Sequence, residues 1–402
     1  MSALGGLARG SDTVRSSRGA SPDAERRGAR TMRPLLTAAS KVAAVLASLL
    51  FALCVGEVAL RIYHHRTYGI DFLSDANHGL LSKDATLGWK MSPNLSYATR
   101  ARDALNKTYA VEVRTDQRGF RQYGNPRADK TRLLVIGDSF TAALDVSNDK
   151  TYYGVMKAAL PDVELFAYGA GGYGSLQEFM LLDEQIDAIR PDLIVWQFYE
   201  NDFLDNDVGL DMLKSLYNTG MPRPYLGQDG GVTYRYATYG ALFFPLPAPI
   251  AENTRLLKLL NARLAVLANR LSRRAPVSEQ IARQGAAHAG FQRAESTTRR
   301  IMEKVRQRAG ATPVYLFPLT DRQPYHEAIR TICQAVGIRF VDSVTQGLRE
   351  QESRIPKSTR AADGEHLNET GNRIVAETLI RYLREQGALP KEPPRAGNVD
   401  LD

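Results

Sequence analysis

The chain has 402 residues, which is enough for one large domain or two ordinary ones with a sizeable core. Hydrophobic residues make up 44% of it and charged residues 24%, a composition that excludes a largely disordered chain. The formal net charge is +8, and residues 1–33 hold seven Arg against three acidic residues. No stripe of Lys and Arg with interleaved aromatic residues follows, so the sequence indicates no nucleic-acid partner.

An apolar segment follows this basic tail. Residues 42–56 carry no charge, and extending the segment to residues 34–60 adds only Lys41 and Glu57. A helix that spans a bilayer needs about 20 mostly apolar residues. The sequence therefore predicts one transmembrane helix over residues 34–62.

The arginines of the tail lie on the N-terminal side of this helix. We expect a single pass through the cell inner membrane, and the positive-inside rule places the N-terminus in the cytoplasm and the rest of the chain on the extracytoplasmic side. A cleaved signal peptide and a buried helix of a soluble protein remain alternatives. Residues 1–33 are expected to be disordered, with Met32 as an alternative start. Cys54 and Cys333 are expected to be unpaired.

Beyond a lead-in module of irregular pattern over residues 63–130, strands and helices alternate. Short apolar runs predict strands over residues 133–136, 163–167, 193–198, 313–317 and 338–341. Helical patterns lie at residues 151–160, 175–189, 297–309, 324–336 and 373–384. This alternation predicts an α/β fold, a three-layer α/β/α sandwich around a parallel sheet, over residues 131–385. Residues 386–402 are expected to be a flexible tail.

Residues 205–295 break the alternation. They hold Gly- and Pro-rich stretches and a helical pattern over residues 255–274, and they are expected to form an insertion over the strand ends, such as a substrate lid. Four acidic residues lie just before this region and at its start: Asp202, Asp205, Asp207 and Asp211. Their spacing does not fit a calcium-binding loop, so a solvated loop is expected.

Polar or glycine-rich residues follow the predicted strands. Ser139 follows the first strand, Gly172 lies in the glycine-rich segment after the second, and Asn201 follows the third. Asp363 and His366 precede the last helix. Ligands bind at the carboxyl ends of parallel strands, so we expect these five residues to meet at one edge of the sheet.

Each of these residues has a chemical use in acyl transfer. The hydroxyl of Ser139 is a weak nucleophile unless a base such as His366 accepts its proton. Asp363 can accept from the imidazole and fix its tautomer. The backbone N–H groups of Ser139 and Gly172 and the side-chain amide of Asn201 can stabilise an oxyanion, and glycine allows close approach of the substrate.

Four segments resemble, in order, sequence blocks of the SGNH (GDSL) hydrolases. They are residues 137–140 (Gly-Asp-Ser-Phe), the region of Gly172, residues 201–202 (Asn-Asp) and residues 363–371 with the Asp-x-x-His pattern. The resemblance covers about residues 131–385 and implies a flavodoxin-like sandwich, acyl-ester chemistry and catalytic roles for Ser139, Gly172, Asn201 and His366. Residues 88–89 (Gly-Trp) and 118–121 are similar to the lead-in of membrane-anchored bacterial members.

The sequence departs from the family pattern at two positions. Tyr199 stands where the third block usually has Gly, and Ala167 replaces an Asn common at the start of the second block. Tyr199 is expected to reshape the oxyanion pocket, which affects the substrate more than the reaction.

The resemblance implies a serine-dependent acyl or acetyl esterase that acts outside the cytoplasm through an acyl-enzyme on Ser139. An O-acyltransferase that modifies an envelope polysaccharide and a non-catalytic polysaccharide-binding protein are alternatives. Expected partners are an acylated small molecule or polysaccharide and the membrane, and no cofactor or metal is expected.

Simpler explanations exist for the single residues. Ser139 can be a helix N-cap, Asn201 a turn residue and Asp363 a cap of the last helix. His64 and His65 lie next to the predicted membrane helix. The other histidines lack an Asp in a triad-like register and are expected to be solvated or core residues: His78, His288 and His326. Residues 169–174 with Glu200 also fit a dinucleotide fingerprint, but that motif belongs on the first strand of its sheet.

Overall fold

The computed structural model describes most of the chain. It covers residues 22–68, 72–73, 80–213, 221–236, 253–257, 259–260, 263–264, 267 and 275–390. Several sequence predictions lie wholly or mostly outside these residues: those for residues 1–21, His78, residues 244–249, residues 255–274 and residues 391–402. The chain divides into two compact units, Met1–Val58 and Ala59–Asp402.

Helix α1 (Pro22–Tyr68) makes up the described part of the first unit and runs into the second. In the described chain, Ser40–Arg66 is the one helix that is long and apolar enough to cross a membrane. It agrees with the predicted apolar helix. Residues 22–33, predicted to be disordered, are helical, because the Ala, Glu and Arg residues among them favour helix.

The second unit is built on a five-stranded parallel sheet. Its strands are β5 (Thr131–Gly137), β6 (Val163–Gly169), β7 (Leu193–Phe198), β10 (Val314–Pro318) and β11 (Arg339–Phe340). Their order across the sheet is β6-β5-β7-β10-β11. Numbered along the chain this is 2-1-3-4-5, the order of flavodoxin-like folds. The predicted fold class is confirmed.

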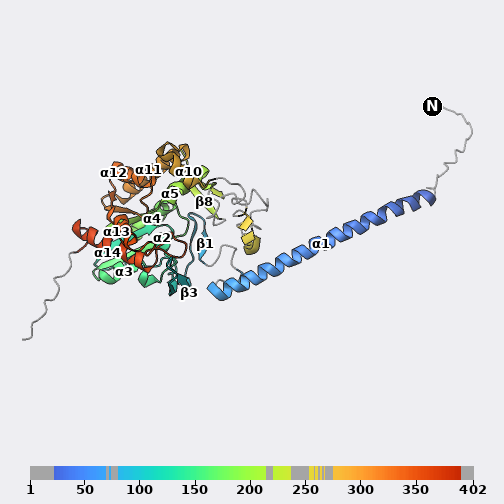
Figure 1. Ribbon diagram of the computed structural model, residues 1–402, viewed down its shortest axis with the longest axis horizontal. Coiled ribbons are helices and arrows are strands. Elements are labelled where there is room, and N and C mark those ends of the chain that lie inside the picture. The colour runs from blue at the N-terminus through green and yellow to red at the C-terminus, as the bar shows by residue number, and fades with distance from the viewer. Residues whose placement is uncertain are drawn as a thin grey trace, which may run out of the picture. The chain divides into compact units, whose positions relative to one another are not determined.

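Helices cover both faces of this sheet (Figure 1). One face carries α3 (Tyr152–Ala159), α13 (Ser343–Arg354) and α14 (Glu369–Glu385), and the other carries α4 (Ser175–Ile189), α11 (Ala289–Ala309) and α12 (Tyr325–Val336). Successive strand residues point to opposite faces, so Leu133 and Val135 pack with the first set, and Leu134 and Ile136 with the second. Two apolar cores result, one on each side of the sheet.

Two antiparallel hairpins occupy the lead-in segment that the sequence predicts as irregular. They are β1 (Leu81–Asp84) with β2 (Gly88–Met91), and β3 (Ser96–Arg102) with β4 (Thr108–Arg114). Trp89, Met91 and Val111 are buried in the same core as α4 and α11. The hairpins are therefore packed against the sandwich.

The tip of the β3–β4 hairpin pairs with the loop between α13 and α14. Asp103 forms an antiparallel bridge with Ala361, and the N–H of Ala104 donates to the carbonyl of Arg360 (3.0 Å). Since this loop also carries Asp363, the hairpin helps to fix the position of this part of the predicted site.

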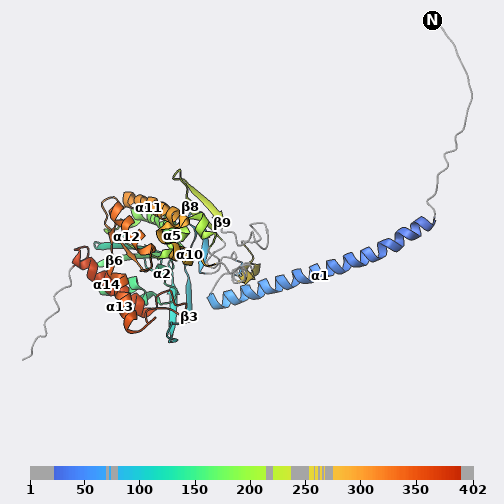
Figure 2. The ribbon, with the colours of Figure 1, turned by 45° about the horizontal axis from the view of Figure 1, so that its top comes forward.

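Much of the predicted insertion over residues 205–295 is packed structure. It includes the last two residues of α5 (Glu200–Asn206), and all of α6 (Val208–Asp211), the hairpin β8 (Pro222–Leu226) with β9 (Val232–Tyr236), and α10 (Val277–Gln284). Figure 2 shows the β8–β9 hairpin extending from the sandwich. Leu210, Val277 and Ile281 are buried in the core on the α4 and α11 side.

The acidic residues at the start of this region are buried. The exposed fractions are 0% for Asp202, 2% for Asp205, 9% for Asp207 and 4% for Asp211. Arg223 of β8 pairs with Asp205 (3.0 Å) and Asp211 (3.1 Å), and Arg293 of α11 pairs with Asp207 (3.2 Å). The expectation of a solvated loop is wrong, because the partner arginines come from elements farther along the chain.

Candidate active site

Ser139 lies at the turn from β5, the strand between β6 and β7, into the short helix α2 (Ser139–Ala142). Asp138 is the N-cap of this helix, and its carboxylate accepts from the N–H of Phe140 (2.9 Å). Ser139 is thus the first residue of the helix and not its cap. Gly137 allows the tight turn, since a Cβ there would lie 2.3 Å from Oε1 of Gln197.

Both ends of α2 are held by side chains from other elements. Oε1 of Gln197 in β7 accepts from the N–H of Asp138 (3.1 Å) and from the hydroxyl of Thr141 (2.9 Å). Arg121 is buried and donates to the carbonyl of Ala142 (2.8 Å). These contacts fix the position of the Ser139 backbone and give a structural role to the Arg of the lead-in motif.

The loop before α14 brings an imidazole to this hydroxyl. Nε2 of His366 lies 2.8 Å from Oγ of Ser139, and Nδ1 lies 2.5 Å from Oδ2 of Asp363. Oδ1 of Asp363 accepts from the N–H groups of Glu365 (2.9 Å) and His366 (3.0 Å), which orients the carboxylate. The cap of α14 is Asn368, so Asp363 is free of that role.

The charges of this pair reinforce each other. The hydrogen bond from His366 holds the pKa of Asp363 at about 2, well below its ordinary value. Burial opposes protonation of His366, but the hydrogen bond and charge of Asp363, with further charge from Asp138 and Asp145, raise the pKa of the imidazole above its ordinary value. The arrangement therefore favours a histidine that takes up a proton from Ser139.

The two predicted oxyanion donors follow the strands on either side of β5. Gly172 lies after β6, and Asn201 lies in the first turn of α5 after β7. Gly172 has φ +75°, a conformation that a residue with a Cβ rarely adopts. The amide of Asn201 donates to Oδ2 of Asp205 (3.0 Å). The sheet thus brings both residues to the same edge as Ser139.

The chain is similar to several solved structures. A member of the lipolytic protein G-D-S-L family from Veillonella parvula DSM 2008 is 12% identical, with 63% of this chain and 98% of that chain covered and a TM-score of 0.35. The lipase/acylhydrolase from Enterococcus faecalis is 14% identical, with 65% and 99% covered and a TM-score of 0.35. An acetylxylan esterase from Geobacillus stearothermophilus is 13% identical, with 65% and 97% covered and a TM-score of 0.33.

No protein-family model matches the sequence, and no curated protein matches it. At these identities and TM-scores the solved structures assign no activity to this chain. Its function has to follow from the geometry of the site.

The aromatic departure from the family pattern has a place in this geometry. The ring of Tyr199 packs on Phe140 with 4.6 Å between centroids, and Phe140 packs on His366 at 4.8 Å. Tyr199 therefore supports the imidazole through Phe140, a role that the sequence does not reveal.

Asp145 is a site residue that the sequence analysis misses. It lies in the turn after α2, and ligand atoms of Asp145, Asp363 and His366 all lie within 4.8 Å of one another. These three groups could hold a divalent cation only by displacing the present partners of the imidazole, because both ring nitrogens are engaged. No sequence signal marks Asp145, since it follows no strand and belongs to no block.

The glycine-rich segment after β6 serves close packing. A Cβ on Gly169 would lie 2.6 Å from the carbonyl oxygen of Asp138, so glycine lets β6 approach the start of α2. The indole N–H of Trp89 in β2 donates to the carbonyl of Gly171 (3.0 Å) and holds the turn in place. Close packing therefore accounts for Gly169, the first glycine of the fingerprint, without a bound dinucleotide.

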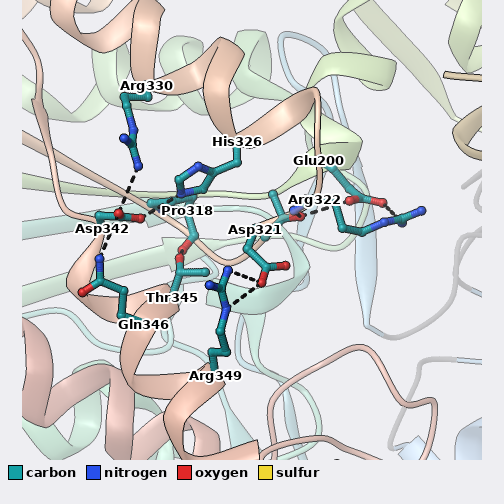
Figure 3. A network of polar contacts seen from close by, with 11 residues as sticks. Glu200, Pro318, Asp321, Arg322, His326, Arg330, Asp342, Thr345, Gln346 and Arg349 are labelled. Atoms are coloured by element: carbon teal, nitrogen blue, oxygen red, sulfur yellow. Dashed lines mark hydrogen bonds and ion pairs between the residues drawn. The ribbon is translucent and has the colours of Figure 1, made fainter. Parts of the chain in front are cut away.

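His326 has an acidic partner that the sequence does not reveal (Figure 3). Nε2 of His326 lies 2.8 Å from Oδ1 of Asp342, whose other oxygen accepts from Arg330 and Gln346, both at 3.0 Å. His326 is buried, as expected of a core residue, and the sequence does not reveal its partner because Asp342 lies 16 positions along the chain, at the N-cap of α13. Asp342 follows β11, which lies three strands away from β5 in the sheet, and the cluster is no part of the triad of Ser139, His366 and Asp363.

The remaining histidines have separate places. His288 caps α11 by accepting from the N–H of Phe291 (3.2 Å), and His64 and His65 lie in α1. Cys54 and Cys333 are unpaired, as the sequence predicts.

Proposed function

We propose that this chain is a serine-dependent ester hydrolase of the SGNH type. The observation that carries the proposal is the position of His366, whose two ring nitrogens lie within hydrogen-bond distance of the Ser139 hydroxyl and the Asp363 carboxylate. Hydroxyl, imidazole and carboxylate in this order are what nucleophilic acyl transfer needs.

Acylation begins when Oγ of Ser139 attacks the carbonyl carbon of an ester and Nε2 of His366 takes its proton. Asp363 stabilises the imidazolium that forms. The oxyanion receives hydrogen bonds from the N–H groups of Ser139 and Gly172 and from the amide of Asn201. The carbon–oxygen bond to the alcohol then breaks, and His366 returns the proton to the leaving oxygen.

Deacylation repeats these steps with water. His366 removes a proton from a water molecule, the hydroxide attacks the acyl carbon, and the bond to Oγ of Ser139 breaks with return of the proton to the serine. The products are a carboxylic acid and the free enzyme. A sugar hydroxyl in place of water would give an O-acyltransferase with the same intermediate.

The location and substrate belong to the same proposal. Helix α1 anchors the chain in the cell inner membrane with the sandwich outside the cytoplasm, where acylated envelope polysaccharides are available. The proposed substrates carry short acyl groups, acetyl above all, which are released as carboxylic acids. The positive N-terminal flank supports this orientation.

A fluorophosphonate probe tests the nucleophile, because it labels only an activated serine. We expect the full-length protein in detergent to be labelled at Ser139 and to hydrolyse short nitrophenyl esters, while Ser139→Ala and His366→Ala lose both properties. Ser353→Ala, on the exposed side of α13, is the matched control and should keep them. A folded wild-type protein without label or turnover would instead support a non-catalytic polysaccharide-binding protein.

The acceptor is tested with the same preparation. Acetate release from a panel of acetylated glycans identifies a hydrolase. Acetylated sugar in place of free acetate, measured by mass spectrometry with an added oligosaccharide, identifies an acyltransferase.

A further inference from the structure

Arg223 is a buried cation with no direct part in the proposed reaction. It lies in β8 and is 4% exposed. Its guanidinium pairs with Asp205 (3.0 Å) and Asp211 (3.1 Å) and donates to Oε1 of Gln177 (2.9 Å). A buried charge needs such partners, and together they fix the plane of the guanidinium.

The first link from Arg223 to the site runs through Asp205. Oδ1 of Asp205 binds the guanidinium, while Oδ2 accepts from the side-chain amide of Asn201 (3.0 Å). The carboxylate is thus held on one side by Arg223 and orients Asn201 on the other. The direction of the Asn201 amide depends on this carboxylate.

The second link runs through Trp89. The guanidinium of Arg223 stacks over the indole, 4.9 Å from the ring centroid, and the indole N–H donates to the carbonyl of Gly171 (3.0 Å). A Cβ on Gly172 would lie 3.8 Å from the indole and 3.9 Å from the guanidinium. Arg223 and Trp89 therefore support the turn at Gly171 and Gly172.

We propose that Arg223 is a positioning residue for the oxyanion-stabilising groups. One guanidinium holds both the carboxylate that orients Asn201 and the indole that supports the turn at Gly172. This inference rests on the proposed function, since these donors matter only if an oxyanion forms.

Arg223 acts through geometry and not through its charge. Asp205 and Asp211 together outweigh the single positive charge of the guanidinium, so the group as a whole cannot attract an oxyanion. A misplacement of about 1 Å at a reacting centre lowers rates by about 10²-fold. Because the oxyanion exists in the transition state and not in the bound ester, the loss should fall on kcat and spare KM.

The test compares kcat and KM for a short nitrophenyl ester in full-length variants. We expect Arg223→Met to lower kcat by about 10- to 100-fold with KM nearly unchanged. Asn201→Ala should lower kcat by about 10²- to 10³-fold. The double variant should lose less than the product of the two effects, because part of the Arg223 effect acts through Asn201 and is already lost in Asn201→Ala.

Arg300→Met is the matched control. The guanidinium of Arg300 donates to the carbonyl of Gly227 (2.8 Å), just after β8, so it anchors the same hairpin from another side. Its loss should change kcat by no more than about twofold. A large loss here would mean that any damage to the hairpin reaches the site, and it would overturn the specific role of Arg223.

Trp89→Phe keeps the proposal testable if Arg223→Met fails to fold because Asp205 and Asp211 lose their arginine partner. Phe keeps a ring under the guanidinium but cannot donate to Gly171, and we expect kcat to fall by about tenfold. If the wild type is active, two outcomes overturn this inference but leave the proposed function intact. One is an unchanged kcat in folded Arg223→Met or Trp89→Phe, and the other is fully multiplicative effects in the double variant. A wild type without turnover or fluorophosphonate label overturns the proposed function as well.

Discussion

His366 decides at which pH Ser139 can act, because only the neutral imidazole accepts a proton. Its pKa lies above the ordinary value of 6.5, mainly through Asp363. We therefore expect kcat/KM for a short ester to rise with pH and to reach half its maximum above pH 6.5. Asp363→Asn should lower kcat on the order of 10⁴-fold and move the acid limb to lower pH, since it removes a nearby negative charge.

Steady-state or stopped-flow rates of wild type and Asp363→Asn across the pH range check both expectations. A variant whose acid limb stays in place while kcat falls would mean that Asp363 orients the imidazole but does not set its pKa.

Asp138 gives a stability prediction with the opposite sign to that of most acidic residues. It is fully buried, and burial raises its pKa from 3.8 to about 6. A raised pKa means that the folded state holds the proton more tightly, so the stabilisation is present below pH 3.8 and is lost as the pH rises to about 6. Asp138→Asn, which is neutral at every pH, should gain about 3 kcal/mol relative to wild type above pH 6 compared with below pH 3.8.

Urea unfolding of both proteins at several pH values measures this difference. A gap between wild type and variant that does not change with pH would show that the carboxylate of Asp138 keeps its ordinary pKa in the fold.

At the scale of residues, the sequence predicts those site residues that belong to local motifs. Ser139, Asp363 and His366 can be found because each stands at a fixed place relative to a strand or the last helix. Asp145 and Arg223 cannot, because only the folded chain brings them near the site. A buried arginine in a hairpin gives the same sequence signal as a solvated one.

Among the elements, the approach of the β1–β2 hairpin to β8 depends on one glycine. Gly88 has φ +81°, and a Cβ there would lie 1.9 Å from the carbonyl oxygen of Pro222. Gly230 has φ +86° with nothing within 4 Å of a Cβ, so it carries the backbone strain without the clash. We expect Gly230→Ala to destabilise by about 1–2 kcal/mol and Gly88→Ala by at least about 2 kcal/mol more.

Thermal or urea unfolding of the two variants gives the comparison. Equal losses would mean that β2 and β8 can separate at no cost, and would weaken the role assigned to Trp89, the neighbour of Gly88.

The elements differ in how far the sequence predicts them. The bounds of β7 and α4 are the predicted ones, because a short apolar run marks β7 and a helical pattern of apolar and polar residues marks α4. α13 is missed because it is rich in charged and polar residues, and it buries few apolar side chains, Val344 and Leu348 among them. α11 begins at Ala289 and not at residue 297, since its first turns are recognisable only by their packing in the core.

At the scale of the whole molecule, the sheet order explains how distant segments meet. β5 lies between β6 and β7, so the residues that follow these three strands converge at one edge. The loop between α13 and α14 then brings His366 from 227 positions along the chain to Ser139. The alternating apolar runs predict a parallel sheet, but they predict neither its strand order nor the hairpins that support its edge.

The last prediction concerns α1, whose apolar stretch fits either a membrane anchor or a signal sequence. If it is an anchor, the mature protein keeps residues before Ser40 and stays in the membrane pellet after alkaline carbonate extraction. An Arg at the centre of a spanning helix costs about 2.5–3.5 kcal/mol, so Leu46→Arg with Leu50→Arg should release the protein or prevent insertion. Leu259→Arg with Leu260→Arg, at exposed leucines outside α1, is the control and should remain in the pellet. A soluble wild-type protein whose N-terminus, read by mass spectrometry, begins after α1 would show instead that the segment is a cleaved signal.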